Sequence, residues 1–143
     1  MSIIIRKLQL DELETAADIF YRAFNAVGEE WTKDICLKRL HQYFNDDSCW
    51  AAEEDGKLIG FLTSKEDNAE DHQELYVDII AVDPDIQKSG VGKQLLQTAE
   101  EYAKEKGYEA VWLSASSKLP SYNWYLKTGY EKTSWVALVK NLE

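Results

Sequence analysis

Two glycines separated by one residue stand directly after a hydrophobic run and before a helical pattern, in the stretch Gln87-Lys88-Ser89-Gly90-Val91-Gly92-Lys93. The first backbone N–H groups of a helix lack partners and carry a partial positive charge. Glycines let these groups converge and leave room for a ligand, so the stretch suits a phosphate or pyrophosphate. The alternative is a tight strand-to-helix turn without a ligand, because the stretch matches neither the G-x-G-x-x-G fingerprint nor the Walker A pattern.

A lone carboxylate, Asp78, interrupts the apolar run Tyr76-Val77-Asp78-Ile79-Ile80. Burial makes a carboxylate a stronger base, so Asp78 is a candidate general base. By the two-residue period of a strand, Tyr76 and Ile80 share its face, with Glu74 closer to the strand's start. The alternative is a structural hydrogen bond between Asp78 and the neighbouring strand.

Acidic and aromatic side chains also meet at Glu29, Glu30 and Trp31. Carboxylates and an indole ring can hold a cation by charge and by the ring face. The alternative is a charged loop that is only solvated.

Hydrophobic periodicity predicts the elements that position these residues. Strand patterns cover residues 3–8, 74–82, 110–115 and 131–140, the last as one strand or a pair, and a hairpin covers residues 49–66 around Asp55-Gly56. Helical stripes cover residues 13–24, 32–44, 91–107 and 121–129. This order predicts an α/β fold with a mixed sheet.

Length and charge limit the function further. The 143 residues, 45% of them hydrophobic, predict one domain over residues 1–143. A formal net charge of −10 disfavours nucleic acid and anionic membranes as partners and attracts a cationic one, or serves solubility alone.

The two cysteines and the lack of a long apolar run indicate the cellular compartment in which the protein is expected. Cys36 and Cys49 do not form a disulfide framework or a zinc spacing, and they read as reduced core thiols. No run reaches the length of a membrane span, and the N-terminus does not read as a signal peptide. These features predict a cytoplasmic protein without a metal.

Two motifs resemble the GCN5-related N-acetyltransferase (GNAT) family. Residues 87–92 match its Q/R-x-x-G-x-G/A signature, and residues 124–130, Trp-Tyr-Leu-Lys-Thr-Gly-Tyr, look like its F-Y-x-K-x-G-F segment. The run F-N-x-x-x-E-x-W-T at residues 24–32 is weakly similar to the aminoglycoside N-acetyltransferase branch. The resemblance implies a single GNAT-like domain with six to seven strands, about four helices, and a splay between the fourth and fifth strands.

The resemblance also implies acetyl-CoA as cosubstrate. Its pantetheine arm would pair with the fourth strand like an added strand, and its pyrophosphate would lie on the backbone N–H groups of the glycine stretch. The residues assigned to the cofactor are Ile80, Ala81, Val82, Gln87, Lys88, Ser89, Gly90, Val91, Gly92, Lys93 and Ser117. Ser117 is included because Lys118 stands where the family often has the Asn that binds this arm.

Tyr125 aligns with the family's general acid, which protonates the departing CoA sulfur; the alternative is one more ring in an aromatic core. Asp78 is the candidate base, and Glu29, Glu30, Trp31 and Tyr76 are assigned to the acceptor. The resemblance implies transfer of an acetyl group to a primary amine, preferably a small cationic one, by direct attack in a ternary complex. The alternatives are a protein lysine or N-terminal acetyltransferase and a non-catalytic CoA-binding module. A homodimer is compatible with the sequence.

Overall fold

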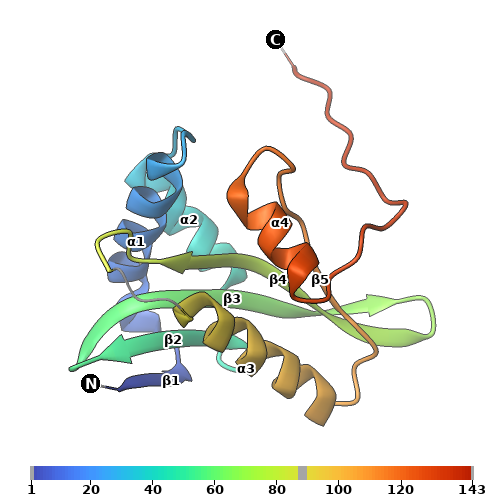
Figure 1. Ribbon diagram of the computed structural model, residues 1–143, viewed down its shortest axis with the longest axis horizontal. Helices are drawn as coiled ribbons and strands as arrows, with labels where there is room; N and C mark the ends of the chain where they lie inside the picture. Colours follow the sequence, from blue (N-terminus) through green and yellow to red (C-terminus); the bar gives the residue numbers. More distant parts are fainter. Residues whose placement is uncertain (1, 87–89, 143) are drawn as a thin grey trace.

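The computed structural model describes residues 2–86 and 90–142 and contains one five-stranded sheet flanked by helices (Figure 1). The strands are ordered β1-β2-β3-β4-β5; the first three pairs are antiparallel and β4 pairs with β5 in parallel. The strands are β1 (Ile3–Lys7), β2 (Cys49–Glu54), β3 (Lys57–Ala69), β4 (His72–Val82) and β5 (Val111–Leu113). The helices are the short 3₁₀ segment η1 (Leu10–Glu12), α1 (Leu13–Ala26), α2 (Lys33–Tyr43), α3 (Val91–Glu105) and α4 (Pro120–Lys127).

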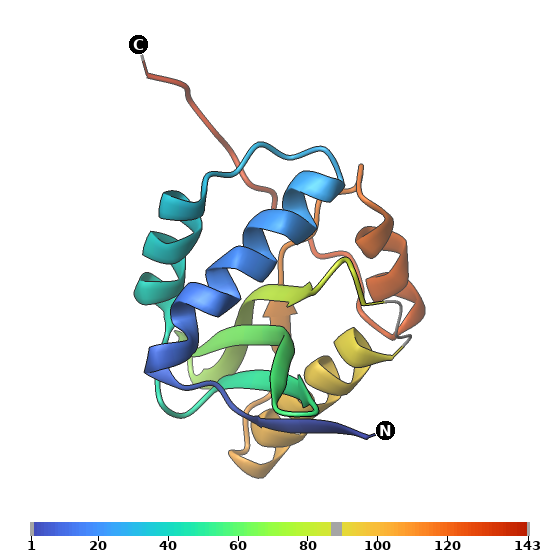
Figure 2. The same ribbon diagram turned by 90° about the vertical axis from the view of Figure 1, so that its left-hand side faces the viewer.

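The helices form two layers around the sheet (Figure 2). The apolar stripes of α1 and α2 cover one face, around the fully buried Phe20 and Leu40. The stripe of α3 covers the other face through Leu95 and Ala99. Each stripe follows the 3.6-residue period that the sequence shows, so the helix positions were predicted correctly.

The turn between β2 and β3 also agrees with the sequence. Asp55 and Gly56 both have positive φ, +53° and +77°. This is the conformation that a two-residue type I′ hairpin requires, and it explains the Asp-Gly pair.

The prediction of six to seven strands is wrong, because the sheet of the described residues has five. Residues 131–140 were predicted as a terminal strand or strand pair. In the structure, residues 131–142 leave the body of the molecule as an extended segment without a strand partner (Figure 1). Its large apolar side chains are at least 76% exposed: Trp135, Val136, Leu138, Val139 and Leu142. β-propensity alone does not make a strand, since a strand also needs a neighbour for its backbone hydrogen bonds.

Candidate active site

The sheet opens on the β5 side of β4. β5 pairs with β4 only through Leu75, Val77 and the residue between them. The C-terminal part of β4, from Ile79 to Val82, pairs with β3 on its other side and has no β5 partner. The backbone groups on this side of Ile80, Ala81 and Val82 therefore border a gap in the sheet, in agreement with the splay that the family resemblance implies.

A β-bulge in β4 reverses the side-chain pattern. Thr63 of β3 pairs with Ile79 and Ser64 pairs with Val77, so Asp78 is the extra residue of β4. Before the bulge, the odd-numbered residues Leu75 and Val77 face the α3 layer; after it, Ile79 and Ala81 face the α1–α2 layer.

The bulge corrects one expectation about Asp78. Asp78 accepts a hydrogen bond from Arg39 of α2. The Lys65 ammonium lies over the rings of both Tyr76 and Tyr43, and Tyr43 belongs to α2. The side chains of Asp78 and Tyr76 therefore lie on one face, as predicted. Ile80 packs against the α3 layer instead. The prediction that Ile80 shares this face is wrong, because the bulge at Asp78 reverses the alternation of side chains between Tyr76 and Ile80.

Helix α3 begins at the glycine stretch. Gly90 is its N-cap with φ +94°, a left-handed conformation that side chains other than glycine rarely adopt. Val91 is 1% exposed and anchors the first turn in the core. Three of the predicted cofactor residues, Gln87, Lys88 and Ser89, lie outside the described residues.

The second glycine has a different explanation. A Cβ on Gly92 would meet only Val82 Cγ2, at 3.9 Å, an ordinary contact. The protein's own packing therefore does not require glycine there, and alanine is the better helix former by about 1 kcal/mol. An open surface at the start of a helix is what a closely approaching phosphate needs.

A cavity of about 320 Å³ lies where the end of β4, the start of α3 and helix α4 meet. It is lined by Ile80, Gly90, Gly92, Lys93, Ser121, Trp124 and Tyr125. The structure thus brings together the two glycines, Lys93, Ile80 and Tyr125, which the sequence assigned to the cofactor and to catalysis.

Tyr125 lies in this cavity from the middle of α4. Its ring packs against Trp124 and Tyr130, with centroids 5.0 and 5.9 Å away. Burial raises the pKa of Tyr125 to about 12, so the phenol is protonated at neutral pH. The described residues form no hydrogen bond with the Tyr125 hydroxyl, whereas the Tyr130 hydroxyl donates to Glu100 Oε2 at 2.7 Å.

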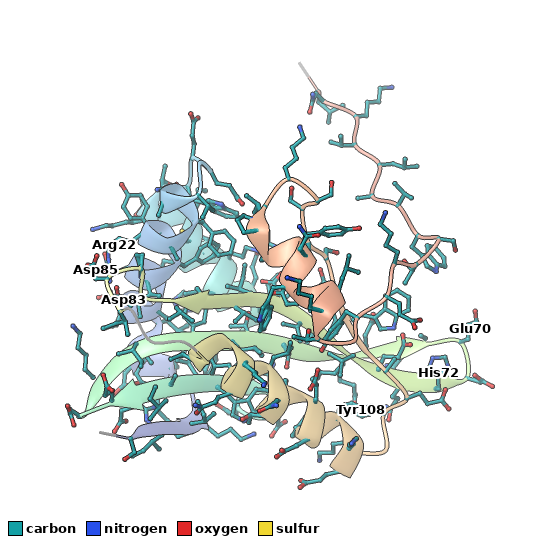
Figure 3. The ribbon with its side chains drawn as sticks, viewed as in Figure 1. Arg22, Glu70, His72, Asp83, Asp85 and Tyr108 are labelled. Carbon is teal, nitrogen blue, oxygen red and sulfur yellow. The ribbon has the colours of Figure 1, made fainter. Side chains whose placement is uncertain are left out.

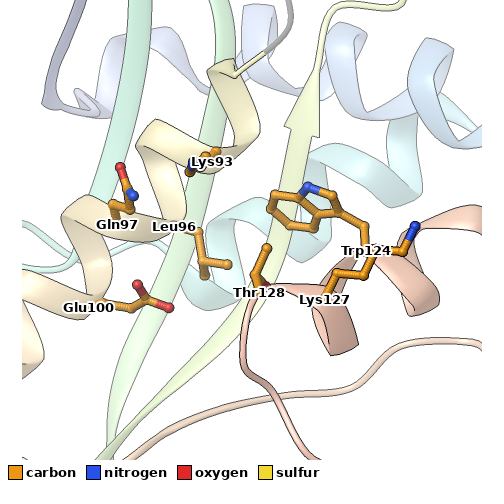
Figure 4. Close-up of a pocket in the computed structure, with 7 residues that line it drawn as sticks. All are labelled: Lys93, Leu96, Gln97, Glu100, Trp124, Lys127 and Thr128. Carbon is orange, nitrogen blue, oxygen red and sulfur yellow. The ribbon is translucent and has the colours of Figure 1, made fainter.

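A second cavity of about 220 Å³ continues between α3 and α4 (Figure 4). Lys93, Leu96, Gln97 and Glu100 line it from α3, and Trp124, Lys127 and Thr128 line it from α4 and its C-cap. Lys93 and Trp124 line both cavities, so the two cavities are neighbours. Trp124 and Lys127 were missed by sequence analysis, although both lie in the segment that was matched to the family.

Asp78 has a partner that the sequence did not reveal. Its side chain is 1% exposed, and both oxygens accept hydrogen bonds from Arg39 of α2, at 2.7 Å from Nη2 and 3.2 Å from Nε. The hydrogen bonds to Asp78 raise the pKa of Arg39. The alternative role for Asp78 was a structural hydrogen bond to the neighbouring strand. The structure shows such a bond to Arg39 of helix α2 instead.

The predicted cation site around Trp31 is filled by the protein's own groups. The indole Nε1 donates to Glu29 Oε1 at 2.7 Å, and the ring packs against Phe20. The guanidinium carbon of Arg39 lies 5.9 Å from the Trp31 ring centroid. Glu30 is exposed, so of this group it is the carboxylate left facing solvent.

Ser117 lies in an exposed turn before α4, away from the lining of both cavities. The serine on the cavity wall is Ser121, in the first turn of α4. The sequence could have predicted that α4 begins at Pro120, which places Ser121 in its first turn, because proline favours the first position of a helix.

Two further searches cover residues 2–86 and 90–142. No helix there combines the length and the apolar character that crossing a membrane requires. In the same residues, no three His, Cys, Asp or Glu side chains are grouped as a metal site would need.

Comparison with known proteins agrees with this geometry. The chain is 26% identical to an uncharacterized N-acetyltransferase of Methanocaldococcus jannaschii, over 96% of the chain and 66% of that protein. The chain therefore spans less than two thirds of the length of this relative. Its fold matches the aminoglycoside N-acetyltransferase AAC(6')-Iy in complex with CoA, with a TM-score of 0.75, 20% identity, and coverage of 98% of this chain and 95% of that one.

A ribosomal-protein-alanine N-acetyltransferase from Brucella melitensis biovar Abortus 2308 is similar in fold as well, with a TM-score of 0.77, 21% identity, and coverage of 99% and 100%. At these identities the two solved structures establish the fold. The model of the Acetyltransferase (GNAT) family matches residues 11–130. The chain belongs to the GNAT family of acetyltransferases.

Proposed function

We propose that this protein is an acetyl-CoA-dependent N-acetyltransferase that acts on a primary amine by direct attack in a ternary complex. The observation that carries the proposal is the junction of the unpaired β4 edge with the cavity that contains Gly90, Gly92 and Tyr125. Bound acetyl-CoA would supply the activated acyl group as a thioester.

The residues present fit such a cosubstrate. The free backbone edge of Ile80–Val82 can hydrogen-bond an arm that carries amide groups, in the manner of an added strand. The start of α3 at Gly90 and Gly92 offers N–H groups to a pyrophosphate. Lys93 lines both neighbouring cavities and Lys127 lines the second one, and both can balance further phosphate charge in an acidic protein.

Tyr125 is the proposed general acid. Its hydroxyl carries a proton at neutral pH, and it lies in the cavity beside Ile80. The desolvation that raises the pKa of the phenol also makes a buried thiolate more basic, so proton transfer between the two stays feasible in the same cavity.

Asp78 remains the candidate base for the amine proton, with one condition set by the geometry. Arg39 donates to both carboxylate oxygens and the side chain of Asp78 is 1% exposed, so the amine proton would reach Asp78 through a water molecule or after a movement of Arg39. Asp78→Asn tests the role. A base predicts a loss of rate that changes the pH profile; a purely structural pair predicts a lower melting temperature and an unchanged profile.

For the acceptor we propose a small cationic amine. The net charge of −10 and the exposed Glu30 favour a cation, and one structural neighbour is named as an aminoglycoside N-acetyltransferase. The neighbour named for ribosomal-protein alanine favours a protein N-terminus as the second candidate.

A screen of acceptors with acetyl-CoA, read by release of the CoA thiol, tests this function. The panel contains aminoglycosides, polyamines, and peptides with a free N-terminus or lysine. Turnover of the small amines supports the first acceptor class, and turnover of peptides alone supports the second. Tight CoA binding without turnover on any member would contradict the enzyme and leave a CoA-binding module.

A further inference from the structure

Arg22 of α1 and two carboxylates, Asp83 and Asp85, join this helix to the turn that follows β4 (Figure 3). Arg22 of α1 donates from Nη1 and Nη2 to the two carboxylate oxygens of Asp83, at 2.8 and 3.1 Å. It also contacts Asp85 Oδ2 at 3.2 Å and Asp18 Oδ2 at 2.9 Å. The residues of the main pair are 61 positions apart in sequence, so the contact links separate parts of the fold.

Asp83 organises the turn in which it lies. Its side chain is 5% exposed, and Oδ1 also accepts the Asp85 N–H at 2.9 Å. Its backbone N–H donates to the Ile59 carbonyl at 2.8 Å, and its carbonyl accepts the Ile86 N–H at 3.0 Å. Pro84, the second residue of this turn, fixes the φ that such a turn uses. Arg22 therefore holds a turn that is already hydrogen-bonded to β3 and to itself.

This turn lies between two walls of the proposed cofactor site. Val82, directly before it, ends the open edge of β4, and Gly90, four residues after Ile86, caps α3. Neither Arg22 nor Asp83 lines the cavity. We propose that Arg22 is a positioning residue for acetyl-CoA: through Asp83 it fixes the turn that sets the start of α3 relative to the end of β4. This inference rests on the proposed function.

The energetics favour such a role. The pair is bidentate, and Arg22 holds the pKa of the Asp83 carboxyl below its ordinary value. Removal of the guanidinium leaves a buried carboxylate without its charge partner, which is strongly unfavourable. The turn can relieve this by moving Asp83 toward solvent, and that movement would displace Val82 at the end of β4 and the hydrogen-bonded Ile86.

The structure supplies a matched control in Arg6. Its side chain is 31% exposed, as is that of Arg22, and it likewise forms ion pairs, in its case with Glu12 and Glu53. Arg6 lies on β1, at the opposite edge of the sheet from β4 and β5. Arg6→Gln therefore removes comparable ion pairs without touching the turn after β4.

The test is isothermal titration calorimetry with acetyl-CoA, combined with melting temperatures, on the wild type, Arg22→Gln, Arg22→Lys, Asp83→Asn, the Arg22→Gln/Asp83→Asn double variant and Arg6→Gln. Titrations are made well below every melting temperature. We expect Arg22→Gln to raise the Kd for acetyl-CoA about tenfold, because a displaced turn after β4 would misalign the end of β4 and the start of α3 with the ligand. We expect Arg22→Lys to lose less and Arg6→Gln to bind as the wild type does.

The double variant shows whether the two residues act as one unit. We expect its Kd to stay within about twofold of Arg22→Gln, since residues in one network are non-additive. Unchanged affinity in Arg22→Gln, with a fall in melting temperature like that of Arg6→Gln, would overturn the positioning role while the function stands. Failure of the wild type and of Arg6→Gln to bind acetyl-CoA would overturn both proposals.

Discussion

Burial raises the pKa of the Tyr125 hydroxyl to about 12, and among the described residues this hydroxyl has no hydrogen-bond partner. By contrast, the nearby Tyr130 hydroxyl donates to Glu100 at 2.7 Å and is committed to the packing of α3. Two tyrosines five positions apart in sequence therefore have different chemical availability. The chemistry of the proposed reaction depends on this difference.

Replacement of Tyr125 by Phe removes the hydroxyl and keeps the ring that packs on Trp124. We expect turnover with an amine from the acceptor screen to fall about a hundredfold, the usual contribution of a general acid. The Kd for acetyl-CoA and the melting temperature should stay close to the wild-type values. Tyr130→Phe is the matched control, expected to lower the melting temperature and to retain turnover. Equal turnover of Tyr125→Phe and wild type would remove Tyr125 from the mechanism.

Single residues also show what the sequence could predict. The two glycines and Tyr125 were found because each belongs to a short local motif, and the structure brings them to one cavity. Arg39 and Arg22 were not found, since their partners lie 39 and 61 positions away in sequence. The contacts of Trp31 with Phe20 and Arg39 were not predicted either, because the packing of α1 and α2 brings these residues together.

At the scale of elements, one β-bulge in β4 directs neighbouring side chains to two different layers of the molecule. The bulge at Asp78 directs Asp78 and Tyr76 toward α2, and Ile80 toward the α3 layer and the cavity. A regular strand would place all three side chains on one face. The hydrophobic pattern of the sequence cannot reveal the bulge, because this part of β4 is apolar on both faces.

The elements flanking this strand were predicted unevenly. Helices and the Asp55-Gly56 hairpin follow local signals, so their positions were confirmed. The predicted number of strands was wrong. Strand pairing depends on residues far apart in sequence, and residues 131–142 have no strand partner in the structure. β5 is short for the same reason: it pairs with β4 over three residues.

The first turn of α3 gives an element-scale prediction. Gly92→Ala should leave the melting temperature unchanged or raise it, because the new Cβ meets only Val82 at 3.9 Å and alanine favours the helix. The same change should raise the Kd for acetyl-CoA, since Gly92 lines the cavity. Thermal melts and calorimetric titrations measure the two effects separately.

Gly60 on β3 is the contrasting control. A Cβ there would lie 3.0 Å from the Ala81 carbonyl oxygen, so Gly60→Ala should destabilise the fold by about 1–3 kcal/mol. If Gly92→Ala also lowers the melting temperature and leaves acetyl-CoA affinity unchanged, glycine at this position serves the fold and the ligand explanation fails.

At the scale of the whole molecule, an acidic chain concentrates its arginines on carboxylates. Arg6 pairs with Glu12, and Arg22 pairs with Asp18 and Asp83; each contact lowers the pKa of the carboxyl group. A carboxyl whose pKa is lower in the folded state stabilises the fold above its unfolded pKa. This stabilisation is lost as the pH falls through the folded value, because the unfolded chain then binds the proton more readily.

The melting temperature should therefore be nearly constant from about pH 7 to pH 5 and fall steeply below about pH 4. Asp83→Asn should start from a lower melting temperature at pH 7 and show a shallower fall, since the most buried of these carboxylates has been removed. Thermal melts at constant ionic strength measure both. Parallel acid profiles for the two proteins would show that Asp83 does not contribute.

The central claim, that the opening beside β4 and the start of α3 bind acetyl-CoA, is tested most directly by thermal melting with increasing acetyl-CoA. A ligand at one hundred times its Kd stabilises the fold by about 2.7 kcal/mol, which should raise the melting temperature by several degrees. ATP, a nucleotide polyphosphate without the pantetheine arm, is the control and should give a much smaller shift. A melting temperature that does not change at millimolar acetyl-CoA, or that responds equally to ATP, would contradict the account.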